Sequence, residues 1–220
     1  MLILIYDKDR YLIIGTGSGI HILNLNLSAS FRIKIHSKIC EKMYIYKNTM
    51  VGLCGKIYQF KLLEIINEFE EERKASLTRT SSEQSLKKYK KYIKALSALG
   101  SSTIKDLVIF DKSAYPFMMA YNSNEIALFL WNPKLACFIP VKVLHSTIQK
   151  TYDFFTPIVP PDSNVPRICV RILQDTASKN LKLVYIDFEE NKLNDIYFEK
   201  KRPAELKILE GHHTLIQVNK

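Results

Sequence analysis

The sequence contains no long apolar run: no window of its 220 residues reaches the roughly 18 uncharged apolar positions that a membrane span needs. Its first apolar stretch is short, ends at Asp7 and has no basic residues before it, so we expect no signal peptide. An alternation of strand-like and helix-like segments is also missing. This absence excludes a doubly wound nucleotide-binding fold.

Cysteine is scarce and dispersed. The four cysteines, Cys40, Cys54, Cys137 and Cys169, show no metal-ligand spacing. Each lies in an apolar run such as VGLCGKIYQF, which is typical of buried, reduced thiols in a cytosolic protein. We therefore expect a cytoplasmic protein without disulfides.

Glycine is also rare, with seven residues, of which three lie in the turn of YLIIGTGSGIHILNL between Gly15 and Gly19. A dinucleotide-binding turn requires G-x-G-x-x-G before a helix, whereas here the spacing is G-x-G-x-G and β-branched residues follow. No Gly-Lys-Ser/Thr follows either, which excludes a Walker loop. We predict a β-hairpin whose positive φ values require glycine, and no cofactor.

Short runs rich in Ile, Tyr, Val and Phe recur between turn residues, which is the pattern of antiparallel β-strands. We expect strands at 2–6, 11–15, 19–24, 31–35, 43–46, 50–54, 56–60, 105–110, 115–121, 125–131, 136–143, 167–173, 181–188, 193–198, 205–209 and 213–218. A proline-rich irregular connection precedes the strand at 167–173. Grouping in about fours favours propeller blades, although periodicity alone does not distinguish a propeller from a sandwich.

One helix and one basic segment interrupt the strands. Apolar residues at helical spacing predict a helix over residues 61–73, and residues 74–92, rich in Ser, Thr and Lys, predict an exposed, mobile loop insertion. Eight Lys or Arg and one Glu between Arg73 and Lys94 give a local charge of +7, out of +10 for the chain. The candidate electrostatic contacts of this segment are Lys87, Lys88, Lys90, Lys91 and Lys94.

The tyrosines of KKYKKYIK alternate with lysines, so this segment could stack on bases or lie at a lipid surface, although a solvated loop explains it as well. RKAS and RTSS resemble kinase sites at Ser76, Ser81 and Ser82, where phosphorylation would cancel much of the local charge.

No group of residues in the sequence has the spacing that catalysis or metal binding needs. His212 and His213 are adjacent, so on a strand they would point to opposite faces. His21, His36 and His145 are isolated in strand patterns, and no acid–base pair or nucleophile elbow is present. Trp131 is expected to pack in a core. We predict no enzyme activity, no metal and no small-molecule substrate.

Four segments, in order, resemble the citron homology family. YLIIGTGSGIHILNL is similar to its opening strand–turn–strand, and IYKNTMVGLCGKIYQFKLLEIINEF to a later strand–turn–strand and helix. EIALFLWNPKLACFIPVKVL and FFTPIVPPDSNVPRICVRI resemble two further strands and the connection after them. The resemblance covers about residues 11–190 and no single motif is diagnostic.

The resemblance implies an all-β fold, a partial β-propeller of about four blades with one short helix and the basic insertion. The family's domain is longer and seven-bladed, so residues 1–220 are expected to form a single truncated citron homology domain. A truncated paralogue, a gene fragment and a piece completed by a partner or by missing blades all remain open. An open propeller has unpaired strand edges that invite pairing.

The function implied by the resemblance is a non-catalytic regulatory module or scaffold that binds small GTPases or other signalling and trafficking proteins. The alternative, from the charge pattern, is binding of a peripheral membrane surface or nucleic acid through residues 73–94.

Overall fold

The structure of the chain is a computed structural model. It describes residues 1–7, 10–26, 32–74, 82–100, 103–111, 116–145, 150–154, 167–173, 181–188, 192–195, 205–208 and 215–218. The chain divides into two compact units. The first comprises Met1–Ser97 with Trp131–Ile139, and the second comprises Ala98–Leu130 with Pro140–Lys220.

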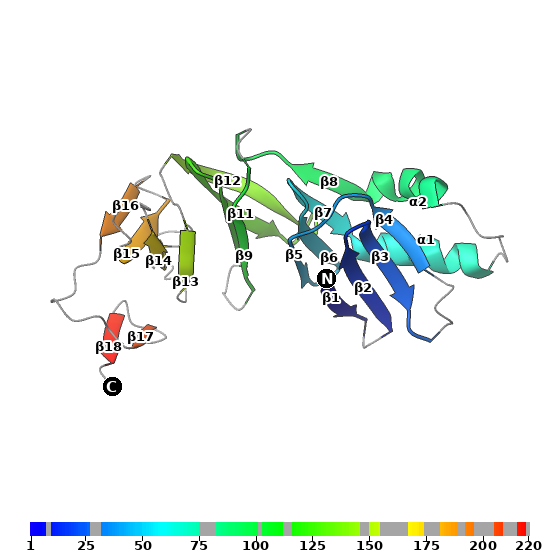
Figure 1. Cartoon of the computed structure of the whole chain (residues 1–220), viewed down its shortest axis with the longest axis horizontal. Coiled ribbons are helices and arrows are strands. Elements are labelled where there is room, and N and C mark those ends of the chain that lie inside the picture. Colours follow the sequence, from blue (N-terminus) through cyan, green and yellow to red (C-terminus); the bar gives the residue numbers. More distant parts are fainter. Residues whose placement is uncertain are drawn as a thin grey trace. The chain divides into compact units, whose positions relative to one another are not determined.

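In the described ranges the fold is almost entirely antiparallel β-sheet, which agrees with the all-β, propeller-like fold class that the resemblance implies (Figure 1). Four sheets have four strands each, in which every strand pairs with the next one along the chain. Sheet A contains β1 (Leu2–Tyr6), β2 (Tyr11–Thr16), β3 (Gly19–Asn24) and β4 (Arg32–His36). Sheet B contains β5 (Lys42–Tyr46), β6 (Thr49–Leu53), β7 (Ile57–Lys61) and β8 (Ile93–Leu96).

Sheets C and D follow the same four-stranded plan, and sheet E has two strands. Sheet C contains β9 (Asp106–Phe110), β10 (Phe117–Tyr121), β11 (Glu125–Asn132) and β12 (Cys137–His145). Sheet D contains β13 (Lys150–Phe154), β14 (Arg167–Leu173), β15 (Leu181–Asp187) and β16 (Lys192–Asp195), and β17 (Glu205–Ile208) pairs with β18 (Leu215–Val218) in sheet E. The sequence pattern missed β8 and β13, and it located the remaining strands within a few residues.

The core of the first unit lies between the inner face of sheet A, sheet B and the first helix. Alternate residues of β2 and β3 are fully buried, among them Ile13, Ile20 and Ile22 at 0% exposure. They form one apolar cluster with Met50 and Phe60 of sheet B. Since side chains of a strand alternate between faces, this packing uses only one face of sheet A.

The second unit has an apolar cluster of its own. Phe117, Met119 and Tyr121 of β10 pack with Ile126 and Leu128 of β11. Leu144, Ile186 and Phe188 complete this cluster. Each unit therefore contains its own buried core.

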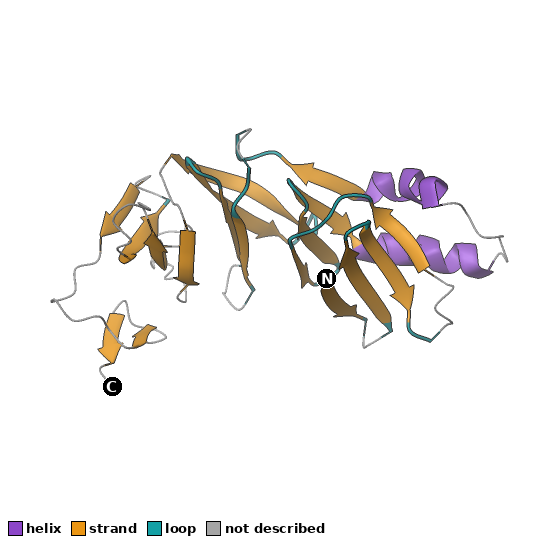
Figure 2. Cartoon of the chain, in the orientation of Figure 1, coloured by secondary structure: helices purple, strands orange, loops and turns teal. Residues whose placement is uncertain are grey.

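Two α-helices are described, both in the first unit (Figure 2). The predicted helix is confirmed as α1 (Leu62–Lys74). The expected loop is wrong for residues 82–92, which form α2 (Ser82–Tyr89) and the short 3₁₀ helix η1 (Lys90–Tyr92). The physical reason is Tyr89, which is 0% exposed and joins the apolar cluster of the first unit. Residues 75–81 lie outside the described residues.

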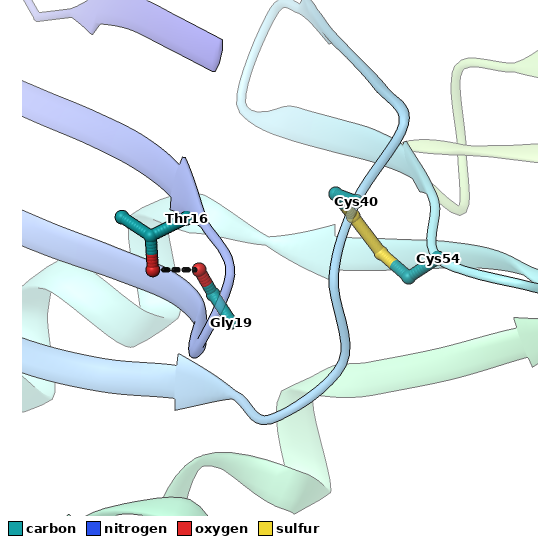
Figure 3. The surroundings of a disulfide bond; sticks show 4 residues. All are labelled: Thr16, Gly19, Cys40 and Cys54. Atoms are coloured by element: carbon teal, nitrogen blue, oxygen red, sulfur yellow. Dashed lines mark hydrogen bonds between the residues drawn. A yellow bond between two sulfur atoms is a disulfide. The ribbon is translucent and has the colours of Figure 1, made fainter. Parts of the chain in front are cut away.

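The glycine turn is the predicted hairpin. Thr16 pairs with Gly19, and Gly17 and Ser18 form the two-residue connection. The Thr16 hydroxyl donates to the Gly19 carbonyl oxygen over 3.1 Å (Figure 3). Positive φ occurs at Gly19, where φ is +123°, and an added Cβ would also collide with the His36 backbone carbonyl oxygen. Glycine at this position therefore admits the close approach of β4.

Cys40 and Cys54 form a disulfide in the first unit, so the expectation of reduced thiols is wrong for this pair (Figure 3). Their predicted burial is confirmed, at 6% and 1% exposure. The bond ties the segment before β5 to the end of β6, two positions that are 14 residues apart. Closing such a loop restricts the unfolded chain. Cys137 is a free thiol, and the side chain of Cys169 lies outside what is described.

We predict that Gly19→Ala lowers the free energy of unfolding by about 2 kcal/mol, because alanine is strained at this φ and its methyl group meets backbone rather than a movable side chain. Urea unfolding followed by circular dichroism measures the change. Gly17→Ala is the matched control, since an added Cβ there has no atom within 4 Å. Equal stability of the two variants would contradict the assigned turn.

Candidate interaction surface

The helix α1 is fixed to the inner side of sheet A by Glu70. Its carboxylate accepts hydrogen bonds from the Tyr11 hydroxyl at 2.9 Å and from the Asn24 amide at 2.8 Å. Arg10 lies 3.7 Å from the same carboxylate. Burial, and then the bond to Glu70, raises the pKa of Tyr11 to about 12. This network fixes α1 to β2 and β3.

A second carboxylate of α1, Glu68, holds α2 and η1. The Lys88 ammonium lies 3.2 Å from Glu68 Oε1, and the Lys91 ammonium lies 3.0 Å from Oε2. Burial raises the pKa of Glu68, but hydrogen bonds from Tyr92, Lys91 and Lys88 together outweigh it and leave this pKa below its ordinary value. Glu68 thus acts as the shared counter-ion of two predicted binding lysines.

The five lysines of the basic segment therefore fall into two groups, those with an ion pair to Glu68 and those without one. Lys88 and Lys91 pair with Glu68, whereas Lys87, Lys90 and Lys94 are exposed and have no ion pair with any described residue. Neither tyrosine of the motif is available for base stacking, because Tyr89 is buried and Tyr92 packs against the core beneath the Lys91 ammonium. Three of the five predicted lysines therefore have no ion pair with a described residue, and Lys91 is also exposed although it is paired.

The other predicted positions are placed only in part. Ser76 and Ser81 lie outside the described residues, and Ser82 is the first residue of α2, with its side chain not described. His212 and His213 also lie outside the described residues. His145 is 80% exposed, at 3.6 Å from Glu125, and His21 contacts the Ser18 hydroxyl at 3.1 Å.

The tip of the β11–β12 hairpin belongs to the first unit and is held by two polar residues of sheet B. The buried Gln59 amide donates to the Phe138 carbonyl oxygen at 2.8 Å and accepts from the Phe138 N–H at 2.7 Å. Thr49 donates to the Ala136 carbonyl oxygen at 2.7 Å. Sequence reasoning missed these residues, since a lone Gln in a strand carries no signal of its partner.

Trp131 packs as the sequence predicts. Its ring lies edge-on to Tyr46 at 4.8 Å between ring centroids and to Phe138 at 5.1 Å. The Lys47 ammonium is 5.7 Å from the centre of the indole ring. The three aromatic rings therefore contribute to packing in the first unit.

The outer face of sheet A, the face turned away from the core of the first unit, carries apolar residues that this core does not cover. Ile3 and Ile5 of the edge strand β1 are 51% and 57% exposed. Behind them, Leu12 and Ile14 of β2 and Leu23 of β3 are only partly buried. Soluble proteins seldom expose contiguous apolar side chains without a binding role, so this face is the candidate interaction surface.

The register arranges this face in rows across the strands. Ile3 lies opposite Ile14, Ile14 opposite His21, and His21 opposite Lys34. In the next row Ile5 lies opposite Leu12, which lies opposite Leu23. The face is therefore apolar over β1 and β2 and becomes basic toward β4.

Over the described ranges, no three or more His, Cys, Asp or Glu residues are grouped so that they could hold a metal ion. No described helix combines the length and the apolar character that crossing a membrane requires.

No known protein-family model matches the sequence. Among solved structures, the chain is similar to the AfRom2 CNH domain, that is, a citron homology domain, with a TM-score of 0.53 and 10% sequence identity. The similarity covers 95% of this chain and 62% of that one, so the chain spans less than two thirds of that structure's length. At this identity the likeness concerns the fold alone, and it supports a citron-homology-like fold.

We predict that Glu68→Gln destabilises the chain by about 1 kcal/mol at neutral pH, because the ion pairs are lost while the lysine partners stay half exposed. The folded pKa of Glu68 is depressed, so its contribution is present above its ordinary pKa of 4.5 and is lost as the pH falls through the folded pKa. Urea unfolding of both proteins at a series of pH values should show the two stabilities converging in acid.

Glu64→Gln is the control for this prediction, since Glu64 is 44% exposed and lies 3.8 Å from Lys61. A loss with Glu64→Gln as large as that with Glu68→Gln, or a difference between Glu68→Gln and wild type that does not change with pH, would contradict the role given to Glu68.

Proposed function

We propose that the chain is a non-catalytic interaction module of the citron homology type that works in small-GTPase or kinase signalling or in vesicle trafficking. One observation carries the proposal: the edge strand of sheet A exposes Ile3 and Ile5 beside partly buried apolar residues of β2 and β3. Such a face gains free energy when another protein covers it. The likeness of the fold to a citron homology domain supports the same assignment.

The contacts of the carboxylates also support a role in binding rather than in chemistry. Glu68 and Glu70 hold helices to their surroundings. Glu125 accepts from the Gly100 N–H at 2.7 Å, and that hydrogen bond is the main reason why its pKa lies below the ordinary value. The lowered pKa values of Glu68 and Glu125 favour their ionised forms, and all three carboxylates are engaged in structural contacts, whereas a general acid or base must be able to exchange its proton near neutral pH.

The proposal treats residues 1–220 as a single module acting in the cytoplasm, whose partners are proteins rather than small molecules. Affinity would come from a few apolar or Arg anchors on an exposed face. Small GTPases are the partner class that the family resemblance suggests.

We predict that affinity capture of the tagged chain from its own cells yields at least one protein that, once purified, re-forms a stoichiometric complex with the chain. A panel of purified small GTPases, loaded with GDP or a non-hydrolysable GTP analogue, tests the expected class by isothermal titration calorimetry. A chain carrying Gly19→Ala is a control for dependence on the fold. If no captured protein re-forms a complex from purified components, the proposal is wrong.

A second candidate function, binding to an anionic membrane surface or to nucleic acid, depends on Lys87, Lys90 and Lys94. These side chains are exposed and have no ion pair with any described residue, and they lie on three consecutive elements of the chain, α2, η1 and β8. The buried Tyr89 and the packed Tyr92 leave charge as the main source of affinity.

We predict for this second candidate that Lys87→Glu/Lys90→Glu/Lys94→Glu weakens binding to phosphatidylserine vesicles or to single-stranded RNA by at least about tenfold at low salt, since three phosphate contacts are lost. Cosedimentation and fluorescence anisotropy measure the two ligands separately. Lys56→Glu/Lys61→Glu/Lys134→Glu alters charges elsewhere in the first unit and is the control. Unchanged binding in the first variant, or none in the wild type, removes this candidate.

A further inference from the structure

Sheet A has two faces that share the same strands but differ in what covers them. The inner face packs against sheet B and α1, where Ile13, Ile20 and Ile22 are 0% exposed. The outer face has β-branched and leucine side chains at the intervening positions of the same strands. Sheet B already covers the inner face of sheet A, which shows that a second β-sheet can pack on these strands.

The chemistry of the outer face is asymmetric. Its apolar part lies over β1 and β2, with Ile3 and Ile5 more than half exposed. Its far side carries Lys34 and His21, which lie opposite each other in the register of β3 and β4. No described side chain at the outward-facing positions of these strands is a carboxylate.

This asymmetry indicates the kind of partner. A cover that spans all four strands must bring apolar residues to Ile3 and Ile5 and carboxylates to Lys34, because a cation buried against apolar residues is costly. A second copy of this face has no carboxylate to offer. Symmetric pairing across all four strands would therefore set Lys34 on apolar residues or against another cation.

We propose that the outer face of sheet A docks an apolar β-sheet surface of another protein, with that partner's carboxylates placed over Lys34. This inference rests on the interaction function proposed above and names the surface and the partner chemistry. β1, which carries Ile3 and Ile5, is the edge strand of sheet A. Apolar cover gives affinity, and the carboxylates fix the orientation.

Two designed, cyclised β-hairpin peptides test this chemistry. Both carry the same Val and Ile face, and they differ in having Glu or Lys at the flanking positions. Fluorescence anisotropy at low salt measures their binding to the full chain. We expect the Glu hairpin to bind at least about tenfold more tightly than the Lys hairpin.

The variants separate the apolar and the charged parts of the face. Ile5→Glu should weaken the Glu hairpin by at least about tenfold, and Lys34→Glu should reverse the preference so that the Lys hairpin binds better. Leu63→Glu, an equally apolar position that is 44% exposed on α1, and Lys61→Glu are the matched controls and should bind like wild type. Circular dichroism establishes that each variant is folded.

Equal binding of both hairpins, no binding, or affinities unchanged in Ile5→Glu and Lys34→Glu would overturn the proposal. Sedimentation velocity addresses the second copy: a dimer of the wild type that Ile5→Glu dissociates would assign this face to self-association instead. A captured protein that binds wild type and all variants alike would leave the interaction function standing and remove only this surface.

Discussion

The core of the first unit depends on the cover of one face of sheet A, its inner face. Alternation along β2 and β3 sends Ile13, Ile20 and Ile22 to one side, where they are completely buried. The same alternation sends Leu12, Ile14 and Leu23 to the other side, where they stay partly exposed. One geometric rule thus creates both the core and the candidate interaction surface.

The two helices extend the same core and are fixed to it by carboxylates. Glu70 joins α1 to the ends of β2 and β3, and Glu68 joins α1 to the helical turn that carries Lys88 and Lys91. Residues 82–94 of the basic segment fold here because Tyr89 reaches the core and because Glu68 of α1 lies beside Lys88 and Lys91. The carboxylate of Glu68 therefore offsets part of the positive charge of this segment, at Lys88 and Lys91.

Most of the strands, the helix α1 and the glycine hairpin could be predicted, because each follows from a local pattern of about ten residues. The helix α2 could not, since its polar sequence resembles a loop and its buried residue Tyr89 packs through contacts distant in sequence. The disulfide between Cys40 and Cys54 could not be predicted for the same reason. Burial of Cys40 and Cys54 follows from their apolar neighbours, but their proximity follows from the pairing of β5 with β6. Gln59 was missed for a similar reason, since its partner Phe138 lies 79 residues away.

The candidate surface could be identified only from the register of the strands, which shows which side chains lie next to one another. The sequence shows that Ile3, Ile14, His21 and Lys34 lie in strands, but not that they form one row. A shift of one residue in any of these pairings would move the apolar side chains to the core face and the buried ones to solvent. The row therefore exists because the core fixes the register, and the core fixes the register because Ile13 and Ile22, which are paired with each other, both turn inward. A surface specified so indirectly combines an apolar half with a basic half, and that combination suits a partner of different chemistry better than a second copy of itself.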